Sequence, residues 1–464
     1  MKLNKIIDCD VDVDVTGISE DSRYVKPGYL FIATKGFNVD HFDFVDDAIA
    51  NGAVAVVCDR KVSFSVPTIT VSDINQALVD ACENFYGVKT NEFNFIGVTG
   101  TDGKTTVASL IKQILDDSKE IAYIGTNGMS VADEKISTSN TTPCVSELYS
   151  LLSDIKKNHC KDVVMEASSE ALLHRRVDSI KYDIAIYTNI TEDHLNIHKT
   201  LESYINSKLK LCDLVKEDGV ILVNGDDDNC KVIDDPRERT YGFSSDNYYV
   251  IKNVQYMSNF VKFDLACKDF TYTVESPLIG KFNIYNAAIA FIVGLIKNIE
   301  PEVLLDRIKH FGPIDGRMEK LDFGQQYTII LDYAHTYNSI KSVLDCFNNV
   351  HRVILVTGAA GGREKKKRSK IGTLVLSRAD YVIFTMDDPR YEKVEDIVSQ
   401  MIGENKSTNY ETIVDRKSAI YRSFDMAKPG DVVLIIGKGR DNYMAIEDKK
   451  LPYCDYDVIK SYFE

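Results

Sequence analysis

Residues 100–106 of this 464-residue chain combine a glycine-rich turn with a lysine and two hydroxyl groups, in the order Gly100-Thr101-Asp102-Gly103-Lys104-Thr105-Thr106. Glycines let backbone N–H groups converge on a phosphate, a lysine bridges the terminal phosphates, and a hydroxyl such as that of Thr105 completes the shell of a Mg²⁺ ion. The stretch predicts a binding site for a nucleoside triphosphate. The strict phosphate-loop pattern has a glycine at the position of Val98, so this stretch is a shortened version of that pattern. A glycine turn that merely punctuates the chain is the alternative.

The flanking residues predict the elements that position this turn. Phe95–Val98 is a short apolar run, typical of a buried strand. After the turn, apolar residues recur at offsets of three and four, as on one face of an amphipathic helix: Val107, Leu110, Ile111, Ile114 and Leu115. Strand, turn and helix together place the partial positive charge of a helix N-terminus at the phosphates.

Two further predicted strands end in side chains that suit a divalent cation. Residues 162–165 lead to Glu166, and residues 184–187 lead to a polar segment that contains His194. Open α/β sheets bind ligands beyond the carboxyl ends of their strands. A carboxylate and an imidazole in that position suit a metal ion beside the phosphates. The alternative is a helix-capping glutamate and a surface histidine.

Lys208 lies within the apolar stripe of the next predicted helix, whereas Lys210 faces away from it. The stripe consists of Leu201, Ile205, Leu209 and Cys212. A lysine in such a stripe commonly extends its charge to solvent. The alternative is a lysine held beside the metal and the phosphates, where a carbamylated amine would supply an anionic oxygen ligand.

The alternation of strands and helices predicts an α/β protein of three domains. We predict a small N-terminal α/β domain over residues 1–92, a central ATP-binding domain with a mostly parallel sheet over 93–312, and a C-terminal domain over 313–464. In the last domain, four apolar strands end in polar residues of both charge signs, which suits a small zwitterionic ligand. We interpret the basic run from Arg363 to Arg368 as a solvated helix start.

Composition narrows the class of protein. The chain has 55 Lys and Arg residues against 70 Asp and Glu, and its formal net charge of −15 argues against nucleic-acid binding. The ten cysteines form no C-x-x-C pair and no zinc-type cluster, which is typical of reduced thiols in the cytoplasm. The acidic N-terminal region is unlike a secretory signal, and no apolar run is long enough to span a bilayer. We expect a cytoplasmic monomer without membrane insertion.

Taken together, the motifs resemble the Mur ligases of peptidoglycan synthesis, and most closely the MurE type. That type adds the third residue of the stem peptide to UDP-N-acetylmuramoyl-L-alanyl-D-glutamate. The resemblance covers essentially the whole chain. Its motifs are DSR at 21–23, GTDGKTT at 100–106, NTTP at 140–143, MEASS at 165–169, TNITEDHLNIH at 188–198, YINSK at 204–208, GKFNIYN at 280–286, GRME at 316–319, LDYAH at 331–335, REKKKR at 363–368, DDPR at 387–390 and GKG at 437–439.

The resemblance implies ATP and Mg²⁺ as cofactors, an N-terminal domain that binds the UDP-linked substrate, and a Rossmann-like C-terminal domain that binds the amino acid. The implied catalytic residues are Lys104, Glu166, His194 and Lys208. The implied metal ligands are Thr105, Glu166, His194 and Lys208 as a carbamate. The implied ATP contacts are Gly100, Thr101, Asp102, Gly103, Lys104, Thr105, Thr106, Asn286, Arg317 and Asp332. The implied contacts to the UDP-muramoyl-dipeptide are Ser22, Asn140, Thr141, Thr142, Ser168, His174 and Arg176. The implied amino-acid pocket is Arg363, Asp387, Asp388, Pro389, Arg390, Gly437 and Asp441.

The reaction that the resemblance implies is amide formation through an acyl phosphate, with meso-2,6-diaminopimelate as the incoming amino acid. Arg390 is the residue linked with that amino acid, because a guanidinium pairs with its second carboxylate. Several positions depart from the family pattern. Outside the amino-acid pocket they are Asp102 for Asn, Asn196 for Asp, Tyr337 for Pro and His174 for Gln; inside it they are Asp388 for Asn and Arg440-Asp441 for a His-Glu pair.

The acidic departures leave room for another amino acid, such as L-lysine or a sulfur analogue of the diamino acid. Two further alternatives are a sister ligase with a folate or γ-glutamyl acceptor, and a non-catalytic ATP-binding paralogue. The N-terminal DSR motif argues against the sister ligase. The complete set of Lys104, Glu166, His194 and Lys208 argues against the paralogue.

Overall fold

The computed structural model describes residues 1–36, 39–116, 120–132, 134–257, 260–348 and 350–464. Its internal contacts divide the chain into two compact units. The first unit contains Met1–Thr191 and Glu202–Val250, and the second contains Glu192–Leu201 and Ile251–Glu464. The predicted α/β fold with a mostly parallel central sheet is confirmed, while the exact domain boundaries remain a prediction.

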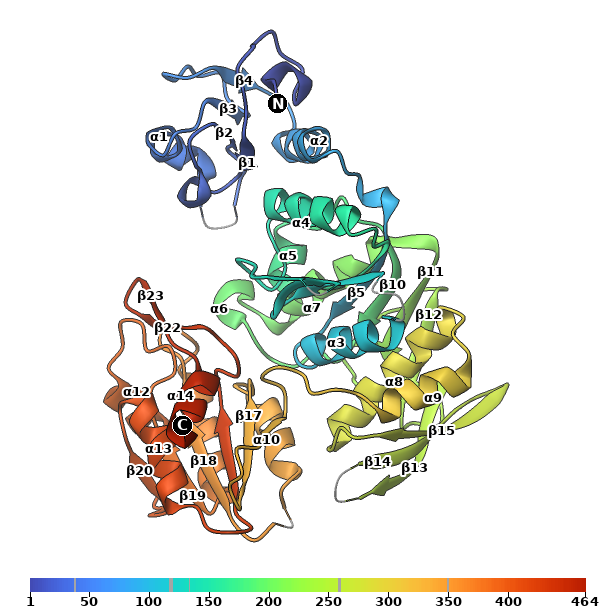
Figure 1. Ribbon diagram of the computed structural model, residues 1–464, viewed down its shortest axis with the longest axis vertical. Helices are drawn as coiled ribbons and strands as arrows, with labels where there is room; N and C mark the ends of the chain where they lie inside the picture. Colours follow the sequence, from blue (N-terminus) through green and yellow to red (C-terminus); the bar gives the residue numbers. More distant parts are fainter. Residues whose placement is uncertain (37–38, 117–119, 133, 258–259, 349) are drawn as a thin grey trace. The chain divides into compact units, whose positions relative to one another are not determined.

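The N-terminal residues of the first unit build a four-stranded parallel sheet in the order β1-β2-β3-β4 (Figure 1). Its strands are β1 (Gly17–Ser19), β2 (Tyr29–Ile32), β3 (Ala55–Cys58) and β4 (Thr68–Thr70). Its helices are η1 (Leu3–Lys5), η2 (Ser22–Tyr24), η3 (His41–Phe44), α1 (Val45–Ala50), α2 (Ile74–Tyr86) and η4 (Thr90–Glu92). The Asp73 carboxylate caps the start of α2, and Gly87 ends that helix with a φ of +64°.

An eleven-stranded sheet follows, in the order β15-β14-β13-β12-β11-β10-β5-β9-β6-β7-β8. β5 pairs in parallel with β10 on one side and β9 on the other, so the carboxyl ends of these three strands meet at one edge. The strands are β5 (Asn94–Thr99), β6 (Ile121–Gly125), β7 (Gly128–Val131), β8 (Glu134–Ile136), β9 (Asp162–Glu166), β10 (Tyr182–Tyr187), β11 (Val215–Asn224), β12 (Glu238–Gly242), β13 (Tyr249–Tyr256), β14 (Val261–Cys267) and β15 (Phe270–Ser276).

Helices lie between these strands and after the last of them. In β5 every residue is buried except Asn94, which is half-buried. The helices are α3 (Lys104–Leu115), α4 (Val145–Lys157), α5 (Ser169–Leu173), α6 (Leu195–His198), α7 (Leu201–Asp213), α8 (Lys281–Ile296) and α9 (Pro301–Lys309). α3 buries four of the five apolar positions of its predicted face, Val107, Leu110, Ile111 and Ile114, while Leu115 is half-buried. Strand, turn and helix around residue 100 therefore form as predicted.

The C-terminal part of the second unit is a six-stranded sheet in the order β16-β17-β21-β18-β19-β20, with a separate hairpin of β22 and β23. From β17 to β20 all neighbours are parallel. The strands are β16 (Glu319–Leu321), β17 (Thr328–Asp332), β18 (Val353–Thr357), β19 (Tyr381–Phe384), β20 (Tyr410–Thr412), β21 (Val432–Ile436), β22 (Tyr443–Ile446) and β23 (Lys449–Pro452). The helices are α10 (Tyr337–Asp345), α11 (Lys366–Arg378), α12 (Val394–Ile402), α13 (Arg416–Met426) and α14 (Asp455–Phe463).

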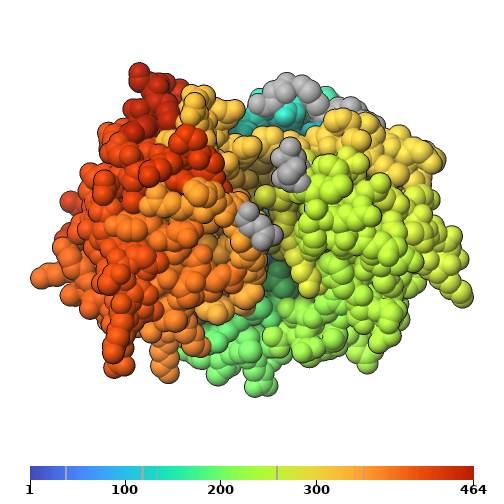
Figure 2. Space-filling model, turned by 90° about the horizontal axis from the view of Figure 1, so that it is seen from below, coloured from blue at the N-terminus to red at the C-terminus, as the bar shows by residue number. Residues whose placement is uncertain are grey.

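Helices cover both faces of this sheet, and each face has its own apolar core. The four strands predicted here are confirmed, and their polar ends lie at the carboxyl edge because the strands are parallel. The yellow-green residues of Figure 2, which include β13 and β14 by its colour bar, contribute to the face shown there. Within the described part of the chain, no helix has both the length and the apolar character to cross a membrane.

Candidate functional site

The glycine turn after β5 is held in place by the segment that follows β10. The Thr101 N–H donates to the Asn189 carbonyl at 2.8 Å, and the Asp102 N–H donates to Asn189 Oδ1 at 2.9 Å. Gly100 has a φ of +151°, and a Cβ there would overlap the Thr188 hydroxyl. Gly103, with a φ of +87°, leads into α3. The turn is therefore preformed, and Gly100 is required by close packing.

Two lysine ammonium groups meet at this turn. Lys104 Nζ donates to the carbonyls of Gly100 and Thr101 at 2.9 and 2.8 Å. Lys208 Nζ donates to the same Gly100 carbonyl at 2.7 Å and lies 4.6 Å from the centre of the Tyr204 ring. The Lys208 side chain is only 1% exposed. The Lys104 ammonium beside a helix N-terminus favours a bound anion such as a phosphate chain.

Lys208 is buried, so the interpretation in which it extends to solvent is wrong. The predicted stripe is also displaced around the helix, because Leu201, Ile205, Leu209 and Cys212 are only half-buried. The buried residues of α7 are Tyr204, Ser207, Lys208 and Leu211. Lys210 is exposed, as predicted.

Glu166, at the end of β9, lies beside the start of α3. It is buried and accepts hydrogen bonds from Thr105 Oγ1 at 3.1 Å, Tyr123 OH at 2.7 Å and the Thr126 N–H at 2.9 Å. The structure thus joins Thr105 and Glu166, two predicted metal ligands, while Thr106 is half-buried on the first turn of α3. Tyr123 and Thr126 were missed by sequence reasoning, because only the order of β6 and β9 in the sheet makes them neighbours of Glu166.

A hydroxyl and a carboxylate supply the hard oxygen ligands that Mg²⁺ prefers, so Thr105 and Glu166 fit such an ion. Across the described ranges, no group of three or more His, Cys, Asp or Glu side chains could hold a metal ion. Glu166 belongs to the first compact unit and His194 to the second. His194 precedes α6 with a φ of +54°, and its role as a metal ligand remains a prediction.

Three residues expected to contact the UDP-linked substrate, Thr142, Ser168 and Arg176, are joined by hydrogen bonds. Thr142 Oγ1 donates to the Glu166 carbonyl at 2.7 Å and accepts from the Ser168 N–H at 3.0 Å. The Arg176 guanidinium donates to the Thr142 carbonyl at 3.3 Å. The Thr141 hydroxyl lies 3.2 Å from that of Thr126, and Asn140 is exposed just before it. The NTTP and MEASS motifs therefore form one polar surface.

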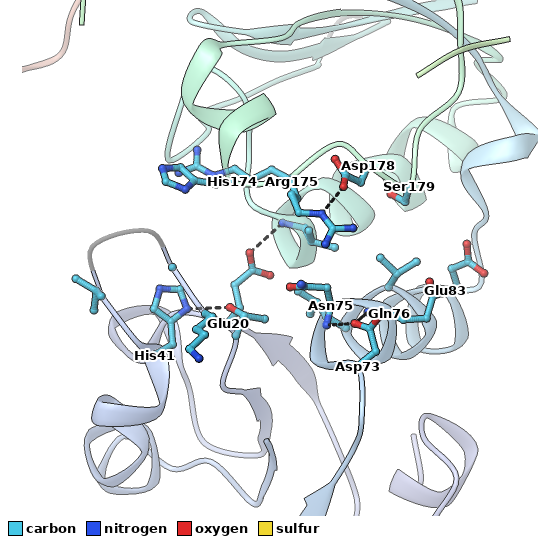
Figure 3. A pocket seen from close by; sticks show the side chains of 18 residues that line it. Glu20, His41, Asp73, Asn75, Gln76, Glu83, His174, Arg175, Asp178 and Ser179 are labelled. Carbon is cyan, nitrogen blue, oxygen red and sulfur yellow. Dashed lines mark hydrogen bonds and ion pairs between the residues drawn. The ribbon is translucent and has the colours of Figure 1, made fainter. Parts of the chain in front are cut away.

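A cavity of about 570 Å³ in the first unit is lined by predicted and unpredicted residues (Figure 3). His174 and Arg176 were predicted; Glu20 and His41 were missed, and the DSR motif just after Glu20 was the available signal. Burial lowers the pKa of His174, and the charge of Arg176 lowers it further. The pKa of His41 is also lowered by burial. Both imidazoles are thereby held in the neutral form that hydrogen-bonds to uncharged or anionic groups.

Glu20 reaches across this cavity wall to α4, as Figure 3 shows. Its carboxylate accepts from the N–H groups of Val145 and Ser146, each at 3.1 Å. Burial raises the pKa of Glu20. Ser22 does not line the cavity; it is buried, and its carbonyl accepts from Asn51 Nδ2 at 2.9 Å.

The predicted nucleotide contacts of the second unit fall into two places. Asp332, at the end of β17, accepts from the N–H groups of Met318 and Ala334 at 2.6 and 2.7 Å. The neighbouring Arg317 lies 4.7 Å from the centre of the Tyr333 ring. Asn286 is buried on α8, where its Nδ2 donates to Asn283 Oδ1 at 3.0 Å. Arg317 directly precedes Met318 and so lies near Asp332, whereas Asn286 is on α8.

The predicted amino-acid pocket lies beyond β19 and β21. Asp388 Oδ1 accepts from Lys438 Nζ and from the Ala445 N–H, each at 2.9 Å. Lys438 Nζ also lies 3.4 Å from Asp441 Oδ2. Burial raises the pKa of Asp387, and a Cβ at Gly437 would overlap that carboxylate. The structure therefore brings together residues 387, 388, 437 and 441, and it adds Lys438, which sequence reasoning missed although the GKG motif contains it.

The loop around Pro389 is held in an unusual backbone conformation. Asp388 and Arg390 have φ values of +44° and +52°, on either side of buried Pro389. Residues without glycine's freedom hold such angles only where surrounding contacts fix them. The Arg390 backbone is fixed in this way by hydrogen bonds with Ala445 and Glu447. No described residue accepts a hydrogen bond from the buried Arg390 Nε.

The interpretation of residues 363–368 as a solvated helix start is wrong at its last residue. α11 begins at Lys366, and Arg363 is exposed. Arg368, however, is buried and donates to both carboxylate oxygens of Glu392 at 2.7 and 2.9 Å. This ion pair lowers the pKa of Glu392 to about 2. The charges in the run could not reveal that Arg368 is buried, because its side-chain partners come later in the chain. Glu392 lies just before α12 and Gln400 lies within it.

Three family models match the chain, and each covers a different part. "Mur ligase family, catalytic domain" matches residues 14–93, "Mur ligase middle domain" matches 98–294, and "Mur ligase, glutamate ligase domain" matches 316–439.

Two curated relatives and one solved structure are similar over nearly the full length. The chain is 36% identical over 458 residues to UDP-N-acetylmuramoyl-L-alanyl-D-glutamate–2,6-diaminopimelate ligase of Caldanaerobacter subterraneus subsp. tengcongensis, with 97% of this chain and 95% of that protein covered. It is 34% identical over 480 residues to the protein of the same name from Bacillus cereus, with 99% and 98% covered. A solved structure of a ligase of that name has a TM-score of 0.66 and 28% identity, with 100% and 98% covered.

Proposed function

Because the chain belongs to the Mur ligase family, we propose that it is an ATP-dependent ligase that joins meso-2,6-diaminopimelate to UDP-N-acetylmuramoyl-L-alanyl-D-glutamate. The observation that carries this proposal is the similarity over nearly the whole length to ligases of that name, at 36% and 34% identity. The family and the MurE type predicted from the motifs are thereby confirmed. The reaction forms an amide and releases ADP and phosphate in peptidoglycan precursor synthesis.

The first step is attack of the D-glutamyl carboxylate on the γ-phosphorus of ATP, which gives an acyl phosphate and ADP. The amine of the incoming amino acid then displaces phosphate and forms the amide. In such phosphoryl transfers the protein positions the reactants and offsets charge. Lys104 and the N-terminus of α3 are suited to hold the phosphate chain, because the Lys104 ammonium already lies at the turn.

We propose that Thr105, Glu166, His194 and a carbamylated Lys208 hold Mg²⁺, which would offset the charge of the phosphates. The fit of Thr105 beside Glu166 supports the first two ligands. The burial of Lys208 at Gly100 supports its place beside the phosphates.

The cavity beside His174 and Arg176 is the proposed site for the UDP-muramoyl part of the acceptor. Its volume of about 570 Å³ is in the range of small-molecule sites. Arg176 offers a cation for the diphosphate, and neutral His41 and His174 offer hydrogen bonds. The ten cysteines, all unpaired, support a reducing compartment, which we propose is the cytoplasm.

Phosphate release in the presence of ATP and UDP-N-acetylmuramoyl-L-alanyl-D-glutamate tests the proposal directly. We expect release that depends on meso-diaminopimelate, with L-lysine and lanthionine tested in parallel and no amino acid as the control. Release that is the same with and without every amino acid, while ATP still binds, would refute the proposed reaction and favour a sister ligase with another acceptor.

Lys208→Ala tests the proposed carbamate. We expect this variant to lose ligation and to regain part of it with an added short-chain carboxylate, which would restore the anionic oxygen. Lys210→Ala is the matched control, because Lys210 lies on the same helix and is exposed. Unchanged turnover in Lys208→Ala would refute the role of this side chain.

A further inference from the structure

Lys438 is a buried ammonium shared by two carboxylates of the predicted amino-acid pocket. Its side chain is 1% exposed, and Nζ lies 2.9 Å from Asp388 Oδ1 and 3.4 Å from Asp441 Oδ2. Burial lowers the pKa of Lys438, but Asp387, Asp441 and Asp388 together outweigh that effect and raise it. The ammonium is therefore charged and acts as the internal counter-ion of this acidic group.

Asp388 and Asp441 are two of the positions at which the chain departs from the family pattern. Considered without Lys438, three carboxylates at residues 387, 388 and 441 would attract an amino acid whose side chain ends in an ammonium. The ammonium of Lys438 already occupies that position beside Asp388 and Asp441. Asp388 Oδ1 also accepts from the Ala445 N–H at 2.9 Å, so this oxygen has little remaining demand for a substrate cation.

Arg390, in the same loop as Asp388, carries the opposite charge. No described residue accepts a hydrogen bond from its buried Nε. Its backbone is anchored to β22 and the turn after it, because its N–H donates to Ala445 O at 3.0 Å and its carbonyl accepts from the Glu447 N–H at 2.9 Å. The guanidinium is thus carried on a fixed loop, and a planar guanidinium pairs best with a carboxylate.

We propose that Lys438 determines specificity: by offsetting part of the negative charge of Asp388 and Asp441, it makes the pocket select an amino acid with a second carboxylate, for Arg390, over one that ends in an ammonium alone. This inference rests on the proposed function, in which these residues bind the incoming amino acid. The acidic residues Asp388 and Asp441 had left L-lysine open as the incoming amino acid. This inference favours meso-diaminopimelate over L-lysine.

Removal of the Lys438 charge is the decisive change. Lys438→Met keeps a long unbranched side chain but leaves Asp388 and Asp441 without their shared cation. The ammonium of L-lysine can then take the place of the lost one, whereas the second carboxylate of diaminopimelate meets an uncompensated negative field. Specificity is a difference of two affinities, so the ratio of kcat/KM for the two amino acids is the quantity to measure.

The experiment measures phosphate release by the full-length enzyme with ATP and the UDP-linked dipeptide held constant while each amino acid is varied. We expect the wild type to prefer meso-diaminopimelate. We expect Lys438→Met to lower the diaminopimelate-to-lysine ratio by at least about tenfold, as loss of one buried charge contact implies. Lys438→Arg should keep the ratio near that of the wild type, and Asp388→Asn in the Lys438→Met background should restore part of it.

Asp388→Asn alone keeps the test decisive if Lys438→Met does not fold. This variant removes one carboxylate while the Lys438 ammonium stays, so the ratio should rise in favour of diaminopimelate. The KM for ATP serves as the internal control for a general loss of structure.

The outcomes separate this inference from the proposed function. A wild type that prefers L-lysine, or ratios that stay the same in Lys438→Met and in Asp388→Asn, would overturn the role of Lys438 while the ligase function stands. A wild type that uses neither amino acid would refute the proposed function itself, and this inference with it.

Discussion

Arg416 is the residue whose replacement should most clearly weaken the C-terminal sheet. It is 0% exposed at the start of α13, and its guanidinium forms two hydrogen bonds with Asp455, at 2.8 and 2.7 Å. It also donates to the carbonyls of Met386 and Ile436 at 3.3 and 2.9 Å. Those carbonyls directly precede Asp387 and Gly437, so one buried cation fixes the starts of two loops of the predicted amino-acid pocket.

Among the described residues, Arg416→Met would leave the Tyr453 hydroxyl, at 2.8 Å, as the side-chain donor to the buried Asp455 carboxylate. Breaking a buried ion pair by removing one partner costs about 3–5 kcal/mol. Because each 1.4 kcal/mol is a factor of ten, the β21 amides should exchange their hydrogens about a hundredfold to a few thousandfold faster. Hydrogen–deuterium exchange with peptide resolution measures this, and the KM for the amino acid should rise more than the KM for ATP.

Arg422→Met is the matched control for this experiment. Arg422 lies on the same helix and pairs with Glu411 at 3.0 Å, but the two side chains are 48% and 28% exposed. Solvent screens such a pair, so exchange in β21 should change little. Acceleration of less than about tenfold in Arg416→Met, or equal effects of both variants, would refute the reasoning that burial makes the Arg416 pair essential.

Three further predictions concern the phosphate loop and the acidic pocket. Gly100→Ala places a Cβ against the segment after β10 and should weaken ATP binding at least about tenfold in calorimetric titration. Gly87→Ala, where nothing lies within 4 Å of the added Cβ, should leave ATP binding unchanged. Equal ATP affinities of the two variants would contradict a preformed loop. Lys104→Met should reduce ATP-dependent phosphate release at least about a hundredfold. Lys112→Met, on the same helix, should leave the rate of release unchanged. Similar rates in the two variants would show that Lys104 does not act at the phosphate site. Burial raises the pKa of Asp441 to about 6 from an ordinary value of 3.8. The folded state therefore holds a proton that the unfolded state releases, and the stability this contributes is complete below about pH 4 and is lost as the pH rises through about 6. The melting temperature should fall more between pH 4 and pH 7 in the wild type than in Asp441→Asn, and identical profiles would contradict the raised pKa.

Local patterns in the sequence determined most of the elements that carry the site. The glycines at 100 and 103 and the apolar periodicity after them predicted β5, the turn and α3, because backbone freedom and amphipathic burial act over a few residues. Glu166 was placed correctly at a strand end for the same reason. The stripe on α7 was displaced, since half-buried Leu and Ile residues look the same in the sequence as fully buried ones.

The charge balance of the two sites was decided only by the tertiary structure. Glu166 is satisfied by Tyr123 and Thr126, which become its neighbours through the order of the strands in the sheet. Lys438 lies between Asp388 and Asp441 because the ends of β19 and β21 lie at one edge of the sheet. The sequence determines which charged groups exist and where along the chain they stand. Whether a given charge is solvated, neutralised or available to a substrate depends on partners far away in the sequence, because burial makes an unpaired charge costly and only folding decides the pairs.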